Sequence, residues 1–261
     1  MRLMLGLAND NGTTMYDNKQ LKDYKRPSEI VGILLEAKAF HPTRSARNHL
    51  KILAAQGGIP TKRVDEVLEI VGLKDEAKKG PGKFSLGMSQ RLGLAAALLA
   101  NPKYLLLDEP ANGLDPEGIV WLRQFLKGYA ESKHGVFVSS HLLGEMSQLA
   151  DNVVVIGKGS LLADTSMKEF IAHNVGSSVY VRVEKTDKFI DFLDKQKIAY
   201  ERKDNGIVLT NAKTDDIGKL AFEAKVPVLE LSIKSASLEE AFLEVTAGAE
   251  EYTGRGVKNA K

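Results

Sequence analysis

The chain has 261 residues, enough for one large domain or for a medium domain with a small one, and we expect two domains. Its 36 basic and 34 acidic residues nearly cancel, and no run of Lys or Arg stands out, so the charge pattern does not indicate a nucleic-acid partner. The absence of cysteine excludes disulfides and thiolate metal sites. The longest strongly apolar stretch, residues 92–100, is about half the ~20 residues that a membrane-spanning helix needs, so we expect no span.

The first two thirds of the chain alternate short apolar strands with amphipathic helices. Strands are predicted over residues 13–16, 30–35, 104–107, 135–139 and 152–156. Helices are predicted over residues 61–72, over 89–100 and around Trp121. Gly72 stands where a C-terminal helix cap is expected. This alternation predicts α/β architecture with a mainly parallel sheet covered on both faces.

A second unit is predicted from about Gly176, where apolar and polar residues begin to alternate as on a half-exposed strand. The order of predicted elements is βαββαβ, with strands near 179–183, 198–202, 207–210 and 226–231, which is the ferredoxin-like arrangement. A last helix starts with the capping box of residues 237–240, and the polar remainder is expected to be disordered. The predicted division is therefore 1–175, 176–246 and a tail of 247–261.

Four segments follow one another in an order that carries the functional signal. They are Phe84-Ser85-Leu86-Gly87-Met88-Ser89-Gln90-Arg91, Leu105-Leu106-Leu107-Asp108-Glu109-Pro110, Asn112-Gly113-Leu114-Asp115-Pro116 and Ser139-Ser140-His141. In this order they resemble the signature helix, the Walker B strand, the D-loop and the switch histidine of the ABC-type ATPases. The resemblance covers most of residues 1–165. It implies a P-loop NTPase fold with a helical subdomain at about 45–100.

Asp108 and Glu109 end an apolar strand at the edge where open α/β sheets place ligands. Asp108 takes the place of the aspartate that holds Mg²⁺ at the terminal phosphates in P-loop ATPases. Glu109 is then the general base that polarises the attacking water. The alternative for this segment alone is a strand that ends in a solvated acidic turn.

Ser85 and Gly87 stand at the start of a helix, where backbone N–H groups and the helix dipole form an anion site. By resemblance they contact the γ-phosphate held by a partner subunit, and Gln90 in the same segment is assigned with them to nucleotide binding. Asp115 is expected to contact the opposite subunit. The signature departs from its usual form, because Leu86 stands where the family has glycine.

His141 directly follows a predicted strand, as suits a side chain that senses the γ-phosphate at the sheet edge. Residues 31–36 resemble the strand that leads to the family's Q-loop, but Glu36 replaces the glutamine. A carboxylate can still coordinate Mg²⁺, so Glu36 is a second metal candidate. The stretch 37–48 corresponds to the surface where the family docks a coupling helix of its membrane subunit.

No segment reads G-x-x-x-x-G-K-[ST], the P-loop whose N–H groups cradle phosphates. The nearest approach, Gly82-Lys83, is followed by Phe84 instead of Ser or Thr. Residues 1–7 resemble the end of the helix that normally follows the P-loop, so the fold is expected to be truncated at its N-terminus. We therefore expect this chain to be inactive by itself.

The resemblance implies a cytoplasmic ATPase subunit of an ABC-2-type exporter, a group that includes antibiotic-resistance pumps. Such a subunit uses ATP and Mg²⁺, works as a dimer, and is peripheral on the inner face of the plasma membrane through a membrane-spanning permease. One alternative is a degenerate, nucleotide-independent interaction module, which the missing P-loop favours. A second is a soluble ABC protein acting on ribosomes or DNA, but the chain lacks tandem cassettes and long charged inserts.

Overall fold

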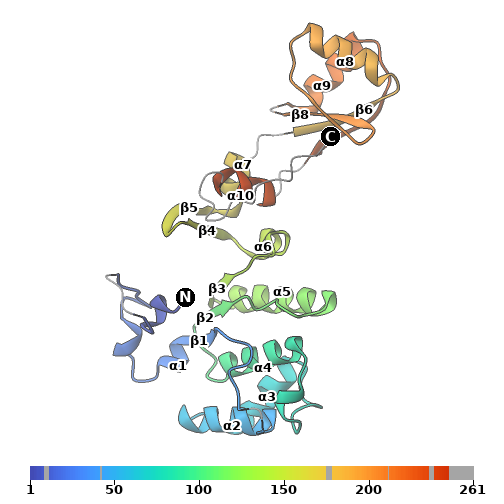
Figure 1. Cartoon of the computed structure of the whole chain (residues 1–261). Coiled ribbons are helices and arrows are strands. Elements are labelled where there is room, and N and C mark those ends of the chain that lie inside the picture. Colours follow the sequence, from blue (N-terminus) through green and yellow to red (C-terminus); the bar gives the residue numbers. More distant parts are fainter. Residues whose placement is uncertain (9–11, 42, 175–177, 211, 235–237, 247–261) are drawn as a thin grey trace, which may run out of the picture. The chain divides into compact units, whose positions relative to one another are not determined.

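The computed structural model describes residues 1–8, 12–41, 43–174, 178–210, 212–234 and 238–246. The chain divides into two compact units, Met1–Leu142 (unit 1) and Leu143–Lys261 (unit 2) (Figure 1). Unit 1 contains, in chain order, the 3-10 helices η1 (Leu3–Leu5) and η2 (Leu21–Asp23), α1 (Pro27–Ile30), β1 (Val31–Leu34), α2 (Ala46–Gln56), α3 (Lys62–Ile70), the 3-10 helix η3 (Pro81–Lys83), α4 (Leu86–Leu98), β2 (Tyr104–Asp108), α5 (Pro116–Glu131) and β3 (Gly135–Ser139).

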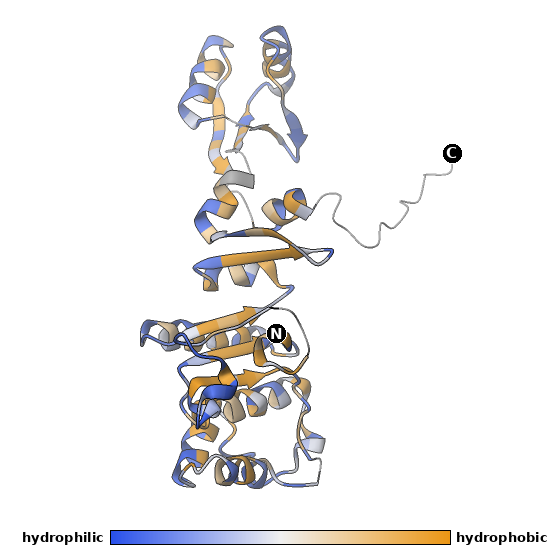
Figure 2. Cartoon of the chain, turned by 90° about the vertical axis from the view of Figure 1, so that its left-hand side faces the viewer, coloured by the Kyte–Doolittle hydropathy of each residue, from blue (hydrophilic) through white to orange (hydrophobic). Residues whose placement is uncertain are grey.

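The three strands of unit 1 form a parallel sheet in the order β1-β2-β3. Its central strand is fully apolar and buried at Leu105, Leu106 and Leu107, as expected for a strand covered on both faces, and Figure 2 shows these strands as hydrophobic. The register places Asp108 opposite Ser139. Within the described residues, no strand pairs with the other edge of β3.

Helix α4 lies directly against β1 because β1 carries a glycine at the contact. A Cβ on Gly32 would lie 2.2 Å from the carbonyl oxygen of Ala97 and 2.7 Å from Pro102, closer than atoms can approach. Side chains of α2 and α3, among them Leu50 and Val67, are buried in the same unit. The signature segment is therefore fixed to the sheet that carries the Walker B strand.

Two sequence predictions in unit 1 need correction. The predicted strand 13–16 is wrong, because the structure has only a single bridge between Tyr16 and Lys19 there. The two residues between them, Asp17 and Asn18, both have positive φ and close a tight turn, so the segment folds on itself. The predicted helix 89–100 starts earlier, at Leu86, because the side chain of Ser85 accepts a hydrogen bond from the N–H of Met88 at 3.2 Å and caps it.

Unit 2 begins with elements that the sequence patterns only partly indicated. They are α6 (Leu143–Leu149), β4 (Asn152–Gly157), β5 (Ser160–Ser166) and α7 (Met167–Asn174). The hairpin of β4 and β5 turns at Lys158 and Gly159, both with positive φ. The last helix, α10 (Leu238–Thr246), packs against α7 and α6, and its Ala241 shares a buried cluster with Phe170. The compact units thus divide after Leu142, and α10 packs with elements that precede Gly176 in the chain.

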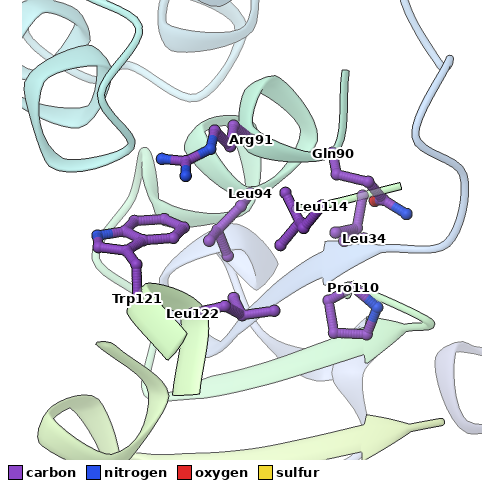
Figure 3. Close-up of a pocket in the computed structure, with 8 residues that line it drawn as sticks. All are labelled: Leu34, Gln90, Arg91, Leu94, Pro110, Leu114, Trp121 and Leu122. Atoms are coloured by element: carbon purple, nitrogen blue, oxygen red, sulfur yellow. The ribbon is translucent and has the colours of Figure 1, made fainter. Parts of the chain in front are cut away.

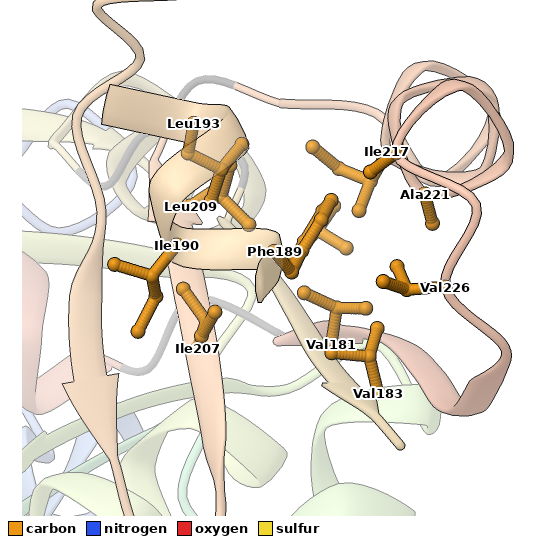
Figure 4. Close-up of a cluster of buried hydrophobic side chains, with 12 residues drawn as sticks. Val181, Val183, Phe189, Ile190, Leu193, Ile207, Leu209, Ile217, Ala221 and Val226 are labelled. Atoms are coloured by element: carbon orange, nitrogen blue, oxygen red, sulfur yellow. The ribbon is translucent and has the colours of Figure 1, made fainter. Parts of the chain in front are cut away.

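The remainder of unit 2 is a four-stranded antiparallel sheet with two helices. Its elements are β6 (Ser178–Val183), α8 (Thr186–Lys195), β7 (Glu201–Lys203), β8 (Gly206–Thr210), α9 (Thr214–Glu223) and β9 (Val228–Lys234). The strand order is β7-β8-β6-β9, and every pair is antiparallel. Figure 4 shows Phe189 of α8 among side chains of β6, β8 and α9, and Phe189 is completely buried. Alternate residues of β6, beginning with Val179, form the floor of this core.

Two predictions in this region are only partly met. The strand predicted over 198–202 covers only Glu201–Lys203, because Ile198 and Tyr200 pack against the core from the loop that follows α8. The predicted cap residue Ser237 and the predicted disordered tail 247–261 lie outside the described residues.

Candidate active site

The candidate site lies where β2 and β3 end at the same edge of the parallel sheet. Asp108 is the last residue of β2, and its carboxylate accepts a hydrogen bond from the hydroxyl of Ser139, the last residue of β3. Glu109 follows Asp108, and its side chain remains 31% exposed, so the carboxylate is reachable from solvent. The two acidic residues that the sequence singled out therefore stand side by side with different surroundings.

Glu109 and His141 are in direct contact, although 32 residues separate them in the chain. Nδ1 of His141 lies 2.8 Å from Oε2 of Glu109, so a proton on Nδ1 is shared with the carboxylate. The His141 side chain is 63% exposed and leaves its other ring nitrogen available to solvent. The structure thus brings the predicted general base and the predicted switch histidine together.

The backbone of Glu109 is held in a conformation that non-glycine residues rarely adopt, with φ of 48°. Its N–H donates to the carbonyl and the hydroxyl of Ser139 at 3.2 Å and 3.1 Å. Its carbonyl accepts from the N–H of Asn112 at 3.1 Å and from the side-chain amide of Gln90 at 3.0 Å. Strain of this kind persists where the surrounding structure fixes it, and here it aims the carboxylate toward His141.

Ser139 is a functional residue to which sequence reasoning gave no separate role. One hydroxyl donates to the carboxylate of Asp108 and accepts from the N–H of Glu109, and so ties both acidic residues to β3. The available signal was a hydroxyl residue that ends an otherwise apolar strand, Gly-Val-Phe-Val-Ser. The pattern could not show that its partner is the end of β2, because strand register is a tertiary property.

Gln90 is placed differently from its prediction as a nucleotide-binding residue. Its side chain is only 6% exposed and turns inward to the carbonyl of Glu109, and its Oε1 has no hydrogen-bond partner. A buried side chain in this position supports the Walker B turn and cannot reach a nucleotide held by another subunit. Ser85, by contrast, is exposed at the N-terminus of α4, as an anion site requires.

Gly87 is buried against the D-loop. A Cβ at this position would lie 2.6 Å from the carbonyl oxygen of Gly113, so only glycine allows the two segments to touch. The unusual Leu86 packs over the same glycine, since a Cβ on Gly113 would lie 2.5 Å from its Cγ. Asp115 is exposed, caps α5 and accepts from the N–H of Gly118 at 2.9 Å. The signature and D-loop are therefore one packed surface.

Arg91 links three helices behind this surface. Its guanidinium donates to the carbonyl of Val71 at the end of α3 at 3.0 Å and lies 4.4 Å from the ring of Trp121 on α5. Figure 3 shows it beside Trp121 among the apolar side chains that line a shallow pocket, including Leu94 and Leu122. Because Arg91 follows Gln90 on α4, one turn of helix connects α3, α5 and the Walker B turn.

Comparisons with known proteins agree with these motifs. The family model described as ABC transporter matches residues 1–112, and a domain of unknown function (DUF8746) matches residues 177–239. The chain is 36% identical over 259 residues to the bacitracin transport ATP-binding protein BcrA of Bacillus licheniformis, covering 95% of this chain and 84% of that protein. The chain belongs to the ATP-binding proteins of the ABC transporters.

Further relatives include the lantibiotic transport ATP-binding protein SrtF of Streptococcus pyogenes, which is 32% identical over 165 residues, or 63% of this chain and 71% of that protein. A solved structure described as an ATP-binding subunit of an ABC transporter matches with a TM-score of 0.59 and 22% identity, over 66% of this chain and 74% of that one. This last similarity supports the ABC ATPase fold. No helix among the described residues is long and apolar enough to cross a membrane.

An ABC ATP-binding protein binds its nucleotide with Mg²⁺, and the residues here fit an ion that arrives with phosphates. β1 and β2 pair in parallel with Leu34 opposite Leu107, so Glu36 and Asp108 follow at the same sheet edge. Among the described residues, no three His, Asp or Glu side chains come together as a metal site. Mg²⁺ is commonly held by one or two carboxylates plus substrate phosphates and water, which matches this sparse donor set.

Proposed function

We propose that this chain is the ATP-hydrolysing subunit of an exporter for peptide antibiotics of the bacitracin and lantibiotic kind. The single observation that carries the proposal is the cluster of Asp108, Glu109, Ser139 and His141, whose hydrogen bonds join the ends of two parallel strands. The substrate class rests on the printed functions of the two named relatives. Nothing else in the subunit specifies the cargo.

In this proposal each residue of the cluster has its own task. Asp108, with Glu36 at the same edge, supplies oxygen ligands to Mg²⁺, which neutralises phosphate charge when bound. Glu109 accepts the proton of the attacking water. His141 orients the Glu109 carboxylate through Nδ1 and presents its other nitrogen to the terminal phosphate. Ser139 holds both carboxylates in register.

The subunit is proposed to act as a head-to-tail dimer on the cytoplasmic side of a membrane-spanning permease. Ser85 and Asp115 then serve the nucleotide of the partner subunit, because both are exposed on the packed surface of signature and D-loop. Gly87 and Gln90 support that surface from inside. The region 178–234 is proposed to be a ferredoxin-like accessory domain, supported by its element order and its strand order β7-β8-β6-β9.

The phosphate-cradling element has to be supplied for turnover, because no segment of the 261 residues has the P-loop pattern. We expect the chain alone to lack measurable ATP hydrolysis. The test is a fusion of the chain to an N-terminal segment that contains a P-loop, assayed for ATP binding and turnover with and without Glu109→Gln. Turnover that depends on Glu109 supports the proposal. Tight ATP binding with turnover unchanged by Glu109→Gln would overturn the site assignment, and no nucleotide binding would favour the interaction module.

A further inference from the structure

The antiparallel sheet of unit 2 has two edges that differ sharply. One edge is β7, which has three residues, all charged and exposed: Glu201, Arg202 and Lys203. Short, charged edge strands prevent a sheet from pairing with other chains. The other edge is β9, which has seven residues. Within the described part of the chain, no strand pairs with its outer side.

β9 also carries exposed apolar side chains. Leu229 is 53% exposed and Ile233 is 68% exposed. Ile233 pairs with Val179 of β6, which is buried in the core, so Ile233 points to the helix-covered face of the sheet. Alternation along the strand places Leu229 on the same face. Both side chains lie beyond the cover that the helices provide.

Helix α9 extends this apolar surface. A Cβ on Gly218 would lie 3.9 Å from Leu231, so this face of α9 runs beside β9. Phe222 lies one helical turn further on the same face and is 83% exposed. Phe222, Leu229 and Ile233 together are here called the β9 edge patch. An open strand edge flanked by exposed apolar side chains is a surface suited to pairing with another strand.

We propose that the β9 edge patch binds the same strand of a second copy of this chain, so that one antiparallel sheet continues through both copies. The strand is self-complementary about Leu231. When two copies align antiparallel with Leu231 opposite Leu231, each Leu229 lies opposite the Ile233 of the other copy. Glu230 then meets Ser232, so no like charges face each other, and Glu230 keeps its ion pair with Arg182. This two-fold, isologous contact needs neither nucleotide nor the ATPase site.

The test uses the full chain in sedimentation equilibrium over the micromolar range. Wild type should form a dimer, and Leu229→Lys and Ile233→Glu should each weaken it by at least about tenfold, as loss of a central contact does. The double variant L229K/I233E should restore the dimer, because the proposed register places each introduced lysine opposite an introduced glutamate. Leu243→Lys on α10 is the matched control, since Leu243 is 62% exposed but lies outside the patch. It should leave the dimer unchanged.

A second measurement tests the register independently of dimer strength. The chain has no cysteine, so Leu229→Cys and Ile233→Cys each introduce a unique thiol. Mild oxidation of a mixture of the two variants should give a cross-linked dimer, whereas either variant alone should not. A wild-type chain that stays monomeric, single variants that dimerise as wild type does, or cross-links within one variant but not in the mixture would each overturn the proposal.

Discussion

Replacing Gly87 by alanine should destabilise unit 1, although alanine is the better helix former. The added methyl would lie 2.6 Å from the carbonyl oxygen of Gly113, whereas ordinary contacts begin at 3.4 Å. A backbone oxygen cannot turn aside, so helix or D-loop must move by roughly 0.8 Å, and overpacking of this kind costs about 1–3 kcal/mol. Alanine returns about 1 kcal/mol of helix propensity, so the net loss in the free energy of unfolding should be about 1–2 kcal/mol.

The chain offers a clean probe for this measurement. Trp121 is the only tryptophan, and it lies in unit 1 with the guanidinium of Arg91 4.4 Å from its ring. Its fluorescence during urea unfolding therefore reports unit 1 separately from unit 2. Gly128→Ala on α5 is the control, because nothing lies within 4 Å of its Cβ position. That variant should raise stability by about 0.5–1 kcal/mol.

The two glycine variants must move in opposite directions. If Gly87→Ala were as stable as wild type or more so while Gly128→Ala gained stability, the signature and D-loop would not be packed as described. In a P-loop-bearing fusion, Gly87→Ala should also reduce turnover, since the surface that closes on the partner subunit would be displaced.

In that same fusion, Glu109→Gln should retain ATP binding and lose turnover by about 100-fold or more, because the amide cannot accept the proton of the attacking water; retained turnover in a purified preparation would refute the role. His141→Ala should lower kcat more than it raises KM, and the opposite pattern would make His141 a binding residue. Gln90→Leu should change the urea stability of unit 1 by less than about 1 kcal/mol, since it removes one hydrogen bond together with a buried unpartnered oxygen; a large loss would show that Oε1 has a partner. Burial raises the pKa of Tyr129 to about 12, above the unfolded value near 10, so its contribution to stability is present below about pH 10 and is lost as pH rises through the folded pKa. Ultraviolet titration should show one tyrosine fewer ionising near pH 10 in the native protein than in Tyr129→Phe after correction for the deleted ring, and equal curves would contradict the burial.

The sequence by itself determined the family motifs and most of the elements that carry them. Gly135–Ser139 is the strand that was predicted, and the strand that ends at Asp108 was placed within one residue. These segments are short, apolar and bounded by strong turn signals, so local pattern is enough to identify them. The order of the motifs then indicated the ABC ATPase fold, which the comparisons support.

Only the tertiary structure decided which side chains of those motifs act together. Ser139 reaches Asp108 across 31 positions of the chain, and the amide of Gln90 reaches Glu109 across 19, because parallel pairing and helix packing bring them to one edge. The same applies to Gly87, whose role is to let two backbones touch. Periodicity shows which residues are buried, but hydrogen-bond partners and close backbone contacts depend on register and packing between distant segments, which no local pattern encodes.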